Sequence, residues 1–234
     1  MRAIKLLLAG WMAVSSITAT KAQTADEIIK KHIDAIGGAD NWKKVNSSRV
    51  EGSFNVQGND VSITITKLQN KGMRQDITVA GMSGYVILTP TAGTTYMPFQ
   101  GQTEPQAMPA DALKEGQYNL DVQGVLVDYK AKGHTVELLG KETIDGKECY
   151  KIKVTLAGGK TFTDYIDAKE FYLVRYTTKQ HANGQETDQT VSFSNFKKLP
   201  EGITVPMTIT QQFGDVIITK MEINKPVDES IFKG

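Results

Sequence analysis

Side chains that often carry catalysis are few and scattered in this chain of 234 residues. His32 lies in an apolar helical segment, His134 follows a glycine before a strand pattern, and His181 lies in the turn QHANGQ. None has the spacing that presents two metal ligands together. We expect His32 at the boundary of a helix's apolar face and His181 in a solvated turn.

Patterns for a nucleophile or a phosphate loop are equally weak. The sequence GMSGY around Ser83 lacks the glycine spacing of a nucleophile elbow and predicts a tight turn. The GGK at 158–160 is not followed by Ser or Thr, and strand patterns flank it, so we expect a hairpin turn. Carboxylates are spread over alternate strand positions where any two could meet, but nothing supports glycosidase-like chemistry. The sequence predicts no catalytic residue, no metal site and no cofactor.

Apolar side chains are conspicuous where the chain cannot be regular. Residues 94–109 read TTYMPFQGQTEPQAMP, and the prolines and glycine forbid a continuous helix or central strand. Methionine is flexible and polarizable, and it suits surfaces that accept varied apolar shapes. We interpret the segment as the hinge and rim of a lid over an apolar cavity, with a core-packing loop as the alternative. The methionines and aromatic residues that cluster in the first half of the chain are Met73, Met82, Met97, Met108, Tyr85, Tyr96 and Phe99.

The first residues predict export. Basic residues precede a short apolar run, and small residues stand where a signal peptidase cuts, so residues 1–22 are expected to be a cleaved signal peptide. The apolar run is too short to span a bilayer as an anchor. Residues 23–234 then form a single domain, because no linker divides them. We expect a periplasmic protein that is not lipid-anchored, has no stable membrane insertion and is a monomer.

Charge and cysteine content exclude other classes. The chain has 27 basic and 26 acidic residues without a basic cluster, which is a poor basis for binding nucleic acid. Cys149 is the only cysteine, which excludes an internal disulfide and a multi-cysteine metal site. It lies in the alternating pattern CYKIKVTL and is expected to be a small buried apolar side chain rather than a reactive thiol.

Hydrophobic periodicity indicates the elements that carry these residues. TADEIIKKHIDAIGG predicts a capped amphipathic helix, and ADNWKKV a short turn with Trp42 packed beneath it. From residue 48 the period is two, giving about eleven or twelve antiparallel strands. Two short helices are expected in the middle, one over 110–115 and one with Val125, Leu126 and Tyr129 on its apolar face. The predicted fold is mainly β with a few helices (α+β), a single strongly curved antiparallel sheet forming an open half-barrel.

This order of elements resembles the LolA/LolB-like lipoprotein-localisation superfamily, in particular its Bacteroidetes-type periplasmic outer membrane lipoprotein-sorting proteins. The likeness lies in ADEIIKKHIDAIGGADNWKKVNSSRVEGSF, GVLVDYKAKGHTVELLGKETIDGKECYKIKVTL, FTDYIDAKEFYLVR and INKPVDESIF. The resemblance implies a half-barrel with a helical lid over a cavity for acyl chains. A carrier of this type has a cavity arginine that latches its lid, and neither Arg74 nor Lys67 matches that motif closely. The anchoring cysteine of the membrane-bound acceptor is absent.

Together these observations predict a non-enzymatic periplasmic carrier or sensor that binds lipid or lipoprotein acyl chains. The alternatives are an envelope protein–protein interaction module and a hydrolase whose constellation the sequence does not display. The residues expected to form the apolar cavity and its lid are Phe54, Ile63, Ile65, Val86, Leu88, Tyr96, Met97, Phe99, Leu126 and Tyr129.

Overall fold

A computed structural model of the chain describes residues 23–56, 58–182 and 185–233. The signal peptide predicted over residues 1–22 and the Asn183-Gly184 turn beside His181 lie outside these ranges. Within them, the structure is mostly β with few helices, as predicted. The strands are β1 Ser47–Val56, β2 Asn59–Leu68, β3 Gly72–Val79, β4 Met82–Leu88, β5 Gly93–Tyr96, β6 Gln106–Ala107, β7 Thr135–Ile144, β8 Lys147–Thr155, β9 Thr161–Asp167, β10 Leu173–Ala182, β11 Gln185–Lys198, β12 Thr204–Gln211 and β13 Gly214–Ile223. The helices are α1 Ala25–Ala35, α2 Ala39–Trp42, η1 Pro98–Gln100, α3 Ala110–Gly116, η2 Gln117–Leu120 and η3 Glu229–Phe232.

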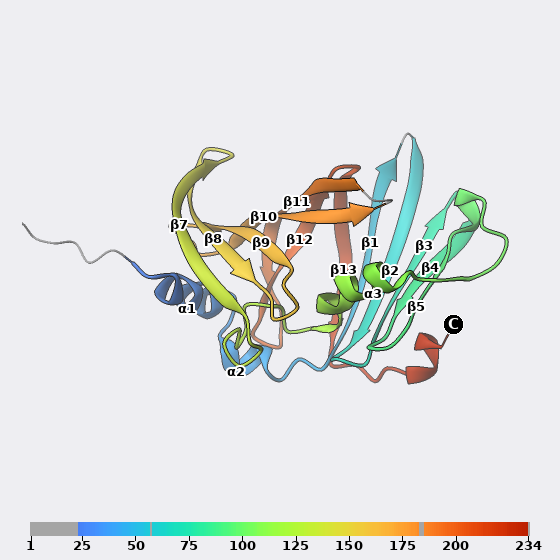
Figure 1. Ribbon diagram of the computed structural model, residues 1–234, viewed down its shortest axis with the longest axis horizontal. Helices are drawn as coiled ribbons and strands as arrows, with labels where there is room; N and C mark the ends of the chain where they lie inside the picture. The colour runs from blue at the N-terminus through green and yellow to red at the C-terminus, as the bar shows by residue number, and fades with distance from the viewer. Residues whose placement is uncertain (1–22, 57, 183–184, 234) are drawn as a thin grey trace, which may run out of the picture.

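The thirteen strands of the described ranges all belong to one antiparallel sheet. Its order is β6-β5-β4-β3-β2-β1-β13-β12-β11-β10-β9-β8-β7, so two meanders meet where β1 pairs with β13. In Figure 1 the sheet bends so that β7–β9 and β2–β5 stand on opposite sides of its central strands. Register shifts next to Gly52 and Gly140 mark bulges, which increase the bend and twist of a strand. The sheet stays open between β6 and β7 over the described residues.

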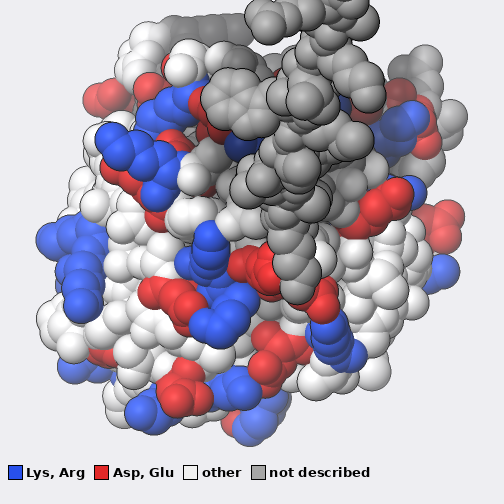
Figure 2. Space-filling model, turned by 90° about the vertical axis from the view of Figure 1, so that its left-hand side faces the viewer, with Lys and Arg blue, Asp and Glu red and all other residues white. Residues whose placement is uncertain are grey.

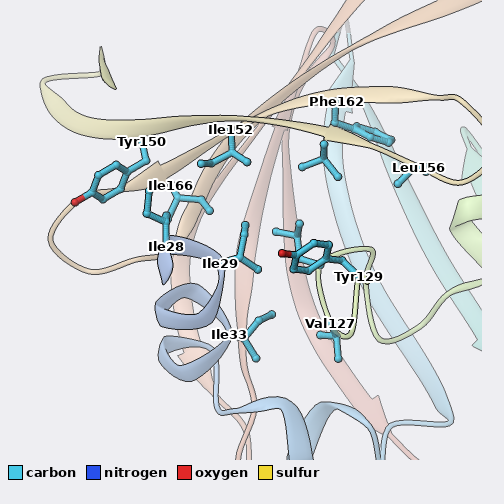
Figure 3. Packing of buried hydrophobic residues seen from close by; sticks show 12 residues of the cluster. Ile28, Ile29, Ile33, Val127, Tyr129, Tyr150, Ile152, Leu156, Phe162 and Ile166 are labelled. Carbon is cyan, nitrogen blue, oxygen red and sulfur yellow. The ribbon is translucent and has the colours of Figure 1, made fainter. Parts of the chain in front are cut away.

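The N-terminal helix α1 begins with the predicted capping box. The Glu27 backbone N–H donates to Thr24 Oγ1 at 3.2 Å, and the Thr24 N–H donates to Glu27 Oε2 at 3.1 Å. Its buried face packs against β8, β9 and the loop at 125–129 (Figure 3). This cluster fills one end of the curved sheet. Its buried members are Ile28, Ile29, Ile33, Leu126, Val127, Tyr129, Tyr150, Ile152, Val154, Leu156, Phe162 and Ile166.

The two middle segments fold differently from each other. Residues 110–116 form α3, as the helix-forming run predicts. The helix expected around Leu126 and Tyr129 is wrong, because residues 122–133 form successive turns. Gly124 and Asp128 have φ values of +86° and +51°, and left-handed residues interrupt a right-handed helix. Leu126 and Tyr129 are nevertheless buried.

The structure also shows where Trp42, Cys149 and Ser83 lie, three residues whose surroundings were predicted from the sequence. Trp42 ends α2, and its Nε1–H donates to the Ile36 carbonyl at 3.0 Å. Cys149 is fully buried, and burial raises the pKa of its thiol. Ser83 is the second residue of β4 rather than a turn residue, and the tight turn lies just before the strand, at Ala80-Gly81. No helix within the described ranges is long and apolar enough to cross a membrane.

Candidate functional site

An apolar cavity of about 820 Å³ lies along one face of β1, β2, β3, β12 and β13. It exists because side chains alternate along each strand, so that Val61, Ile63 and Ile65 of β2 all point to the same side. The sheet's curvature keeps the facing side chains from closing over it. Further apolar lining comes from Trp42, Val45, Val50, Phe54, Val56, Ile77, Val79, Phe99, Val122, Ile203, Val205, Pro206, Ile209, Phe213, Val216, Ile218, Met221 and Ile223.

The two ends of this main cavity differ. Near the hairpin tips, the rings of Phe54 and Phe213 lie 5.0 Å apart, and Phe213 is 48% exposed. Solvent therefore reaches the cavity at this rim. At the opposite end of the strands, Val45, Ile203 and Ile223 are buried and form an apolar floor.

The structure separates the ten predicted cavity residues into groups. Phe54, Ile63, Ile65 and Phe99 line the main cavity. Leu126 lines a second cavity, described below. The remaining five lie outside the lining of both cavities, and ligand binding by any of the ten stays a prediction.

Those five residues have identifiable positions. Leu88 packs with Met73 and Leu120 beneath the segment around α3, and Tyr129 packs in the cluster beside α1. Val86 shares the face of its partner Gln75, which lines the main cavity. Met97 directly precedes η1, where its N–H donates to Gln102 Oε1 at 2.7 Å.

Tyr96 departs from the expected lid position. It pairs with Tyr85 across the β4–β5 ladder, and their rings lie 5.8 Å apart. Tyr85 also stacks against the guanidinium of Arg74, whose Nη1 donates to the Ile231 carbonyl at 3.2 Å. This cluster occupies the face of β3 opposite Gln75 and Ile77, because neighbouring strand residues point to opposite faces. Tyr96 and Arg74 therefore lie away from the main cavity.

Phe99 shows how part of the 94–109 segment covers the sheet. A methyl group added at Gly84 of β4 would lie 2.9 Å from Phe99 Cε1, so the ring rests on the glycine. Farther along β4, Met108, Leu113 and Leu120 cover Leu88. The segment thus packs on the β3–β5 half of the same face that bears the main cavity.

A second cavity of about 440 Å³ adjoins the first. Trp42, Lys67, Val122 and Pro206 line both. The second cavity also carries ionisable side chains, which the pattern of apolar residues had not suggested as a group. These are His32, Tyr118, Asp121, Asp164 and Tyr176.

Burial governs the ionisation of this group. His32 is 5% exposed, and its desolvation lowers its pKa to about 4, although Nδ1 lies 2.8 Å from the Phe171 carbonyl. Asp164 is 3% exposed between Phe162 and Ile166 of β9, and burial raises its pKa to about 7. Burial, with the nearby Tyr118 and Asp164, also raises the pKa of Tyr176.

Lys67 is the charged residue at the junction of the two cavities. It follows Val61, Ile63 and Ile65 at the same two-residue spacing and so faces the cavity as they do. The alternating pattern of β2 could therefore have identified it as a cavity residue from the sequence. Burial lowers its pKa to about 8, while the charge of Asp121 acts in the opposite direction. Asp164 could have been found in the same way, because it lies two residues from both Phe162 and Ile166 and therefore on the same face of β9.

The arrangement of these side chains is better suited to binding an apolar ligand than to holding a metal ion or reacting with a substrate. The described residues contain no group of three or more His, Cys, Asp or Glu side chains placed to hold a metal ion. The polar lining of the main cavity consists of amides, a serine and one lysine among many apolar side chains. Such a lining binds mainly through burial of apolar surface.

Comparisons with known proteins identify the fold. No family model matches the sequence, and a search of curated proteins finds no match. A LolA superfamily protein from Nitrosomonas europaea is 15% identical, with a TM-score of 0.57 over 91% of this chain and 99% of that one. A DUF1329 family protein from Desulfovibrio piger is 14% identical, with a TM-score of 0.53 over 88% and 97%.

A third structure is described as an outer membrane lipoprotein-sorting protein domain, from Vibrio parahaemolyticus. It is 12% identical, with a TM-score of 0.52 over 88% of this chain and 95% of that chain. At these identities the likeness concerns the fold. The predicted resemblance to the LolA/LolB-like superfamily is therefore confirmed as a LolA-like fold.

Proposed function

We propose that the protein is a non-enzymatic periplasmic carrier or sensor whose main cavity holds the acyl chain of a lipid or lipoprotein. The observation that supports this most strongly is the size and apolar lining of the cavity, which opens at the Phe54–Phe213 rim. Its volume of about 820 Å³ is near the upper end of the range common for ligand pockets, roughly 300–1,000 Å³.

The energetics of such binding follow from area burial. Each buried methylene contributes about 0.8 kcal/mol, so a long chain gains affinity without specific polar contacts. Ordering the chain and the covering segment around Phe99 opposes binding, which gives a means of tuning release.

Two further observations support the cellular setting of the proposal. Residues 1–22 have the layout of a signal peptide, which favours export to the periplasm. The Vibrio parahaemolyticus protein with the same fold is described as lipoprotein-sorting, which makes lipoprotein acyl chains a reasonable ligand class. Delivery of lipoproteins to the outer membrane is thus a specific form of the proposed function.

The proposal is tested by filling the cavity. Ile65 lines it, whereas its neighbour Thr64 points to the other face of β2 and pairs with Glu51. We expect Ile65→Trp to reduce binding of a fluorescent fatty-acid probe at least tenfold because the indole occupies ligand space, and Thr64→Trp to bind like the wild type. Equal binding by both variants, with both folded by circular dichroism, would contradict the proposal.

The open edge at β7 supports a second candidate, an envelope protein–protein interaction module. The ten-residue strand β7 pairs only with β8 within the described ranges, and Leu139 on it is 46% exposed. Unpaired strand edges can bind an added strand. If this edge binds a protein partner, Leu139→Lys should reduce cross-linking of that partner in cells, and Ile65→Trp should leave it unchanged.

A further inference from the structure

The position of Lys67 is unusual for a lysine. It lies near the end of β2, it is only partly exposed, and it lines both cavities rather than the outer surface. The residues preceding it on the same face, Val61, Ile63 and Ile65, are all apolar and line the main cavity. A cationic group therefore lies at one end of the apolar main cavity.

Among the described residues, no hydrogen bond or ion pair engages the Lys67 ammonium. The carboxylate whose charge acts on it, Asp121, is held by other groups. Lys132 Nζ lies 2.6 Å from Asp121 Oδ2, and Gln69 Nε2 donates to Oδ1 at 3.0 Å. The Gln123 N–H donates to the same Oδ1 at 3.1 Å. The negative charge of Asp121 is thus neutralised locally, and the positive charge of Lys67 is left over.

An unpaired cation that is partly removed from water is costly to maintain. Removing an ammonium group from water without a counterion is unfavourable, and this desolvation lowers the pKa of Lys67. Methionine or leucine at this position would continue the apolar stripe without that penalty. A lysine with these properties is understandable where a ligand supplies the missing anion.

We propose that Lys67 pairs with the anionic headgroup of an amphiphile, a carboxylate or a phosphate, whose apolar chain lies in the main cavity. This inference rests on the proposed function and specifies the class of ligand. The ligand is an acidic lipid rather than a neutral one, and its headgroup lies at the junction of the two cavities. The second cavity leaves space beside Lys67 for the remaining headgroup atoms.

The dimensions agree with this orientation. From Lys67 to Asn59, which lines the rim end of the main cavity, β2 advances eight residues, or roughly 26 Å at about 3.3 Å per residue. One acyl chain spans half of a hydrocarbon core of about 30 Å, roughly 15 Å. A chain whose headgroup contacts Lys67 therefore fits within the length of the cavity and runs toward Phe54 and Phe213.

The test uses three probes of equal chain length, hexadecanoate, hexadecyl phosphate and hexadecanol, in calorimetric titrations at pH 7. We expect one or both anionic probes to bind the wild type about ten- to a hundredfold more tightly than hexadecanol, as a charge-assisted contact provides. The anionic probe that binds more tightly identifies carboxylate or phosphate as the headgroup. Lys67→Met should abolish the preference without weakening hexadecanol binding, and Lys67→Arg should retain it.

The exposed Lys220 provides the matched control, because it lies on β13 and pairs with Glu222 rather than lining either cavity. Lys220→Met should keep the wild-type preference. Equal affinity of the wild type for all three probes, or a preference that persists in Lys67→Met, would overturn the role of Lys67 and leave the acyl-chain proposal standing. Failure of all three probes to bind the wild type would overturn the proposed function, and this inference with it.

Discussion

At the scale of single residues, the site is defined by a few ionisable groups in apolar surroundings. Lys67 and Asp164 both line the second cavity, and burial disfavours the charged form of each. They are not paired with each other in the described structure, so each responds to pH separately. Their different chemistry leads to two distinct predictions.

Binding of an anionic amphiphile should weaken as pH rises above about 8, where Lys67 of the free protein loses its proton. We expect the preference for hexadecanoate over hexadecanol to fall at least several-fold between pH 7.5 and 9.5, measured by probe displacement. Among the facing groups, His32 is already neutral throughout this range and Asp121 is bound to Lys132. The pKa values of Tyr118 and Tyr176 are raised above their ordinary value of 10.

Asp164 is the facing group whose charge could complicate that profile, since its pKa of about 7 lies close to the window. The Asp164→Asn variant removes this ionisation. A preference in that variant that stayed constant from pH 7.5 to 9.5 would contradict the role of the Lys67 charge.

Asp164 itself should make stability depend on pH. Its pKa of about 7 in the folded protein exceeds the ordinary value of 3.8, so the folded state retains a proton that the unfolded chain loses. Stability from this group therefore falls as pH rises from about 4 to about 7. We expect Asp164→Asn to match the wild type near pH 4 and to be more stable by up to roughly 4 kcal/mol at pH 8 in urea unfolding.

The exposed Asp188 of β11 is a suitable comparison, because its change to Asn should leave the pH dependence as in the wild type. If Asp164→Asn were no more stable than the wild type at pH 8, the carboxyl group would have to be solvated or paired in the folded protein.

At the scale of elements, the features that depend on neighbouring residues could be predicted from the sequence, whereas those that depend on long-range contacts could not. The capping box of α1 and the alternation of β2 are properties of neighbouring residues, so the sequence displays them. The turns at 122–133 depend on left-handed residues at Gly124 and Asp128, which tertiary packing selects. Tyr96 was assigned to the cavity because it is apolar, whereas the β4–β5 register directs it to the other face.

The segment containing Phe99 should depend on the glycine beneath it. Gly84→Ala introduces a methyl group 2.4 Å from the Tyr96 carbonyl oxygen and 2.9 Å from Phe99 Cε1, both closer than normal contact, and should displace the segment that runs from Tyr96 to Phe99 from β4. We expect a loss of about 1–3 kcal/mol in urea unfolding, as for other overpacked sites, with faster proteolysis near residues 97–109.

Gly158→Ala is the control for that experiment, since a methyl group there meets no atom within 4 Å. Gly158 also has no positive φ that would strain an alanine. Unchanged stability and proteolysis in Gly84→Ala would mean that the segment does not rest on β4.

At the scale of the whole molecule, one curved sheet carries both the stability and the candidate site. The cluster around α1 fills the β7–β10 half, and the segment from η1 to η2 covers the β3–β5 half. Between them, the central strands leave the main cavity. The sequence predicted the open half-barrel, but the pairing of β1 with β13 joins residues far apart in the chain and could not be deduced from local patterns.

The outer surface offers a contrast to the cavity. On the side of β7 and α1, the described acidic and basic side chains in view are intermixed, without a large patch of either sign among them (Figure 2). Pairs such as Lys141–Glu148 and Lys151–Glu142 on β7 and β8 contribute to this mixture. Exposed pairs of this kind stabilise a protein little, and they provide no strong field for a charged macromolecule on this face. Apolar burial in the cavity is the stronger basis for binding.

Lipid analysis of the protein itself tests the central claim most directly. The protein is purified from a bacterial envelope without detergent and analysed by native mass spectrometry, followed by solvent extraction. We predict a bound acyl-chain amphiphile with an acidic headgroup, close to one per molecule, that is lost from Ile65→Trp and retained by Thr64→Trp. A wild-type protein that carries no lipid, and that takes up none when offered acidic or neutral lipids, would contradict the account.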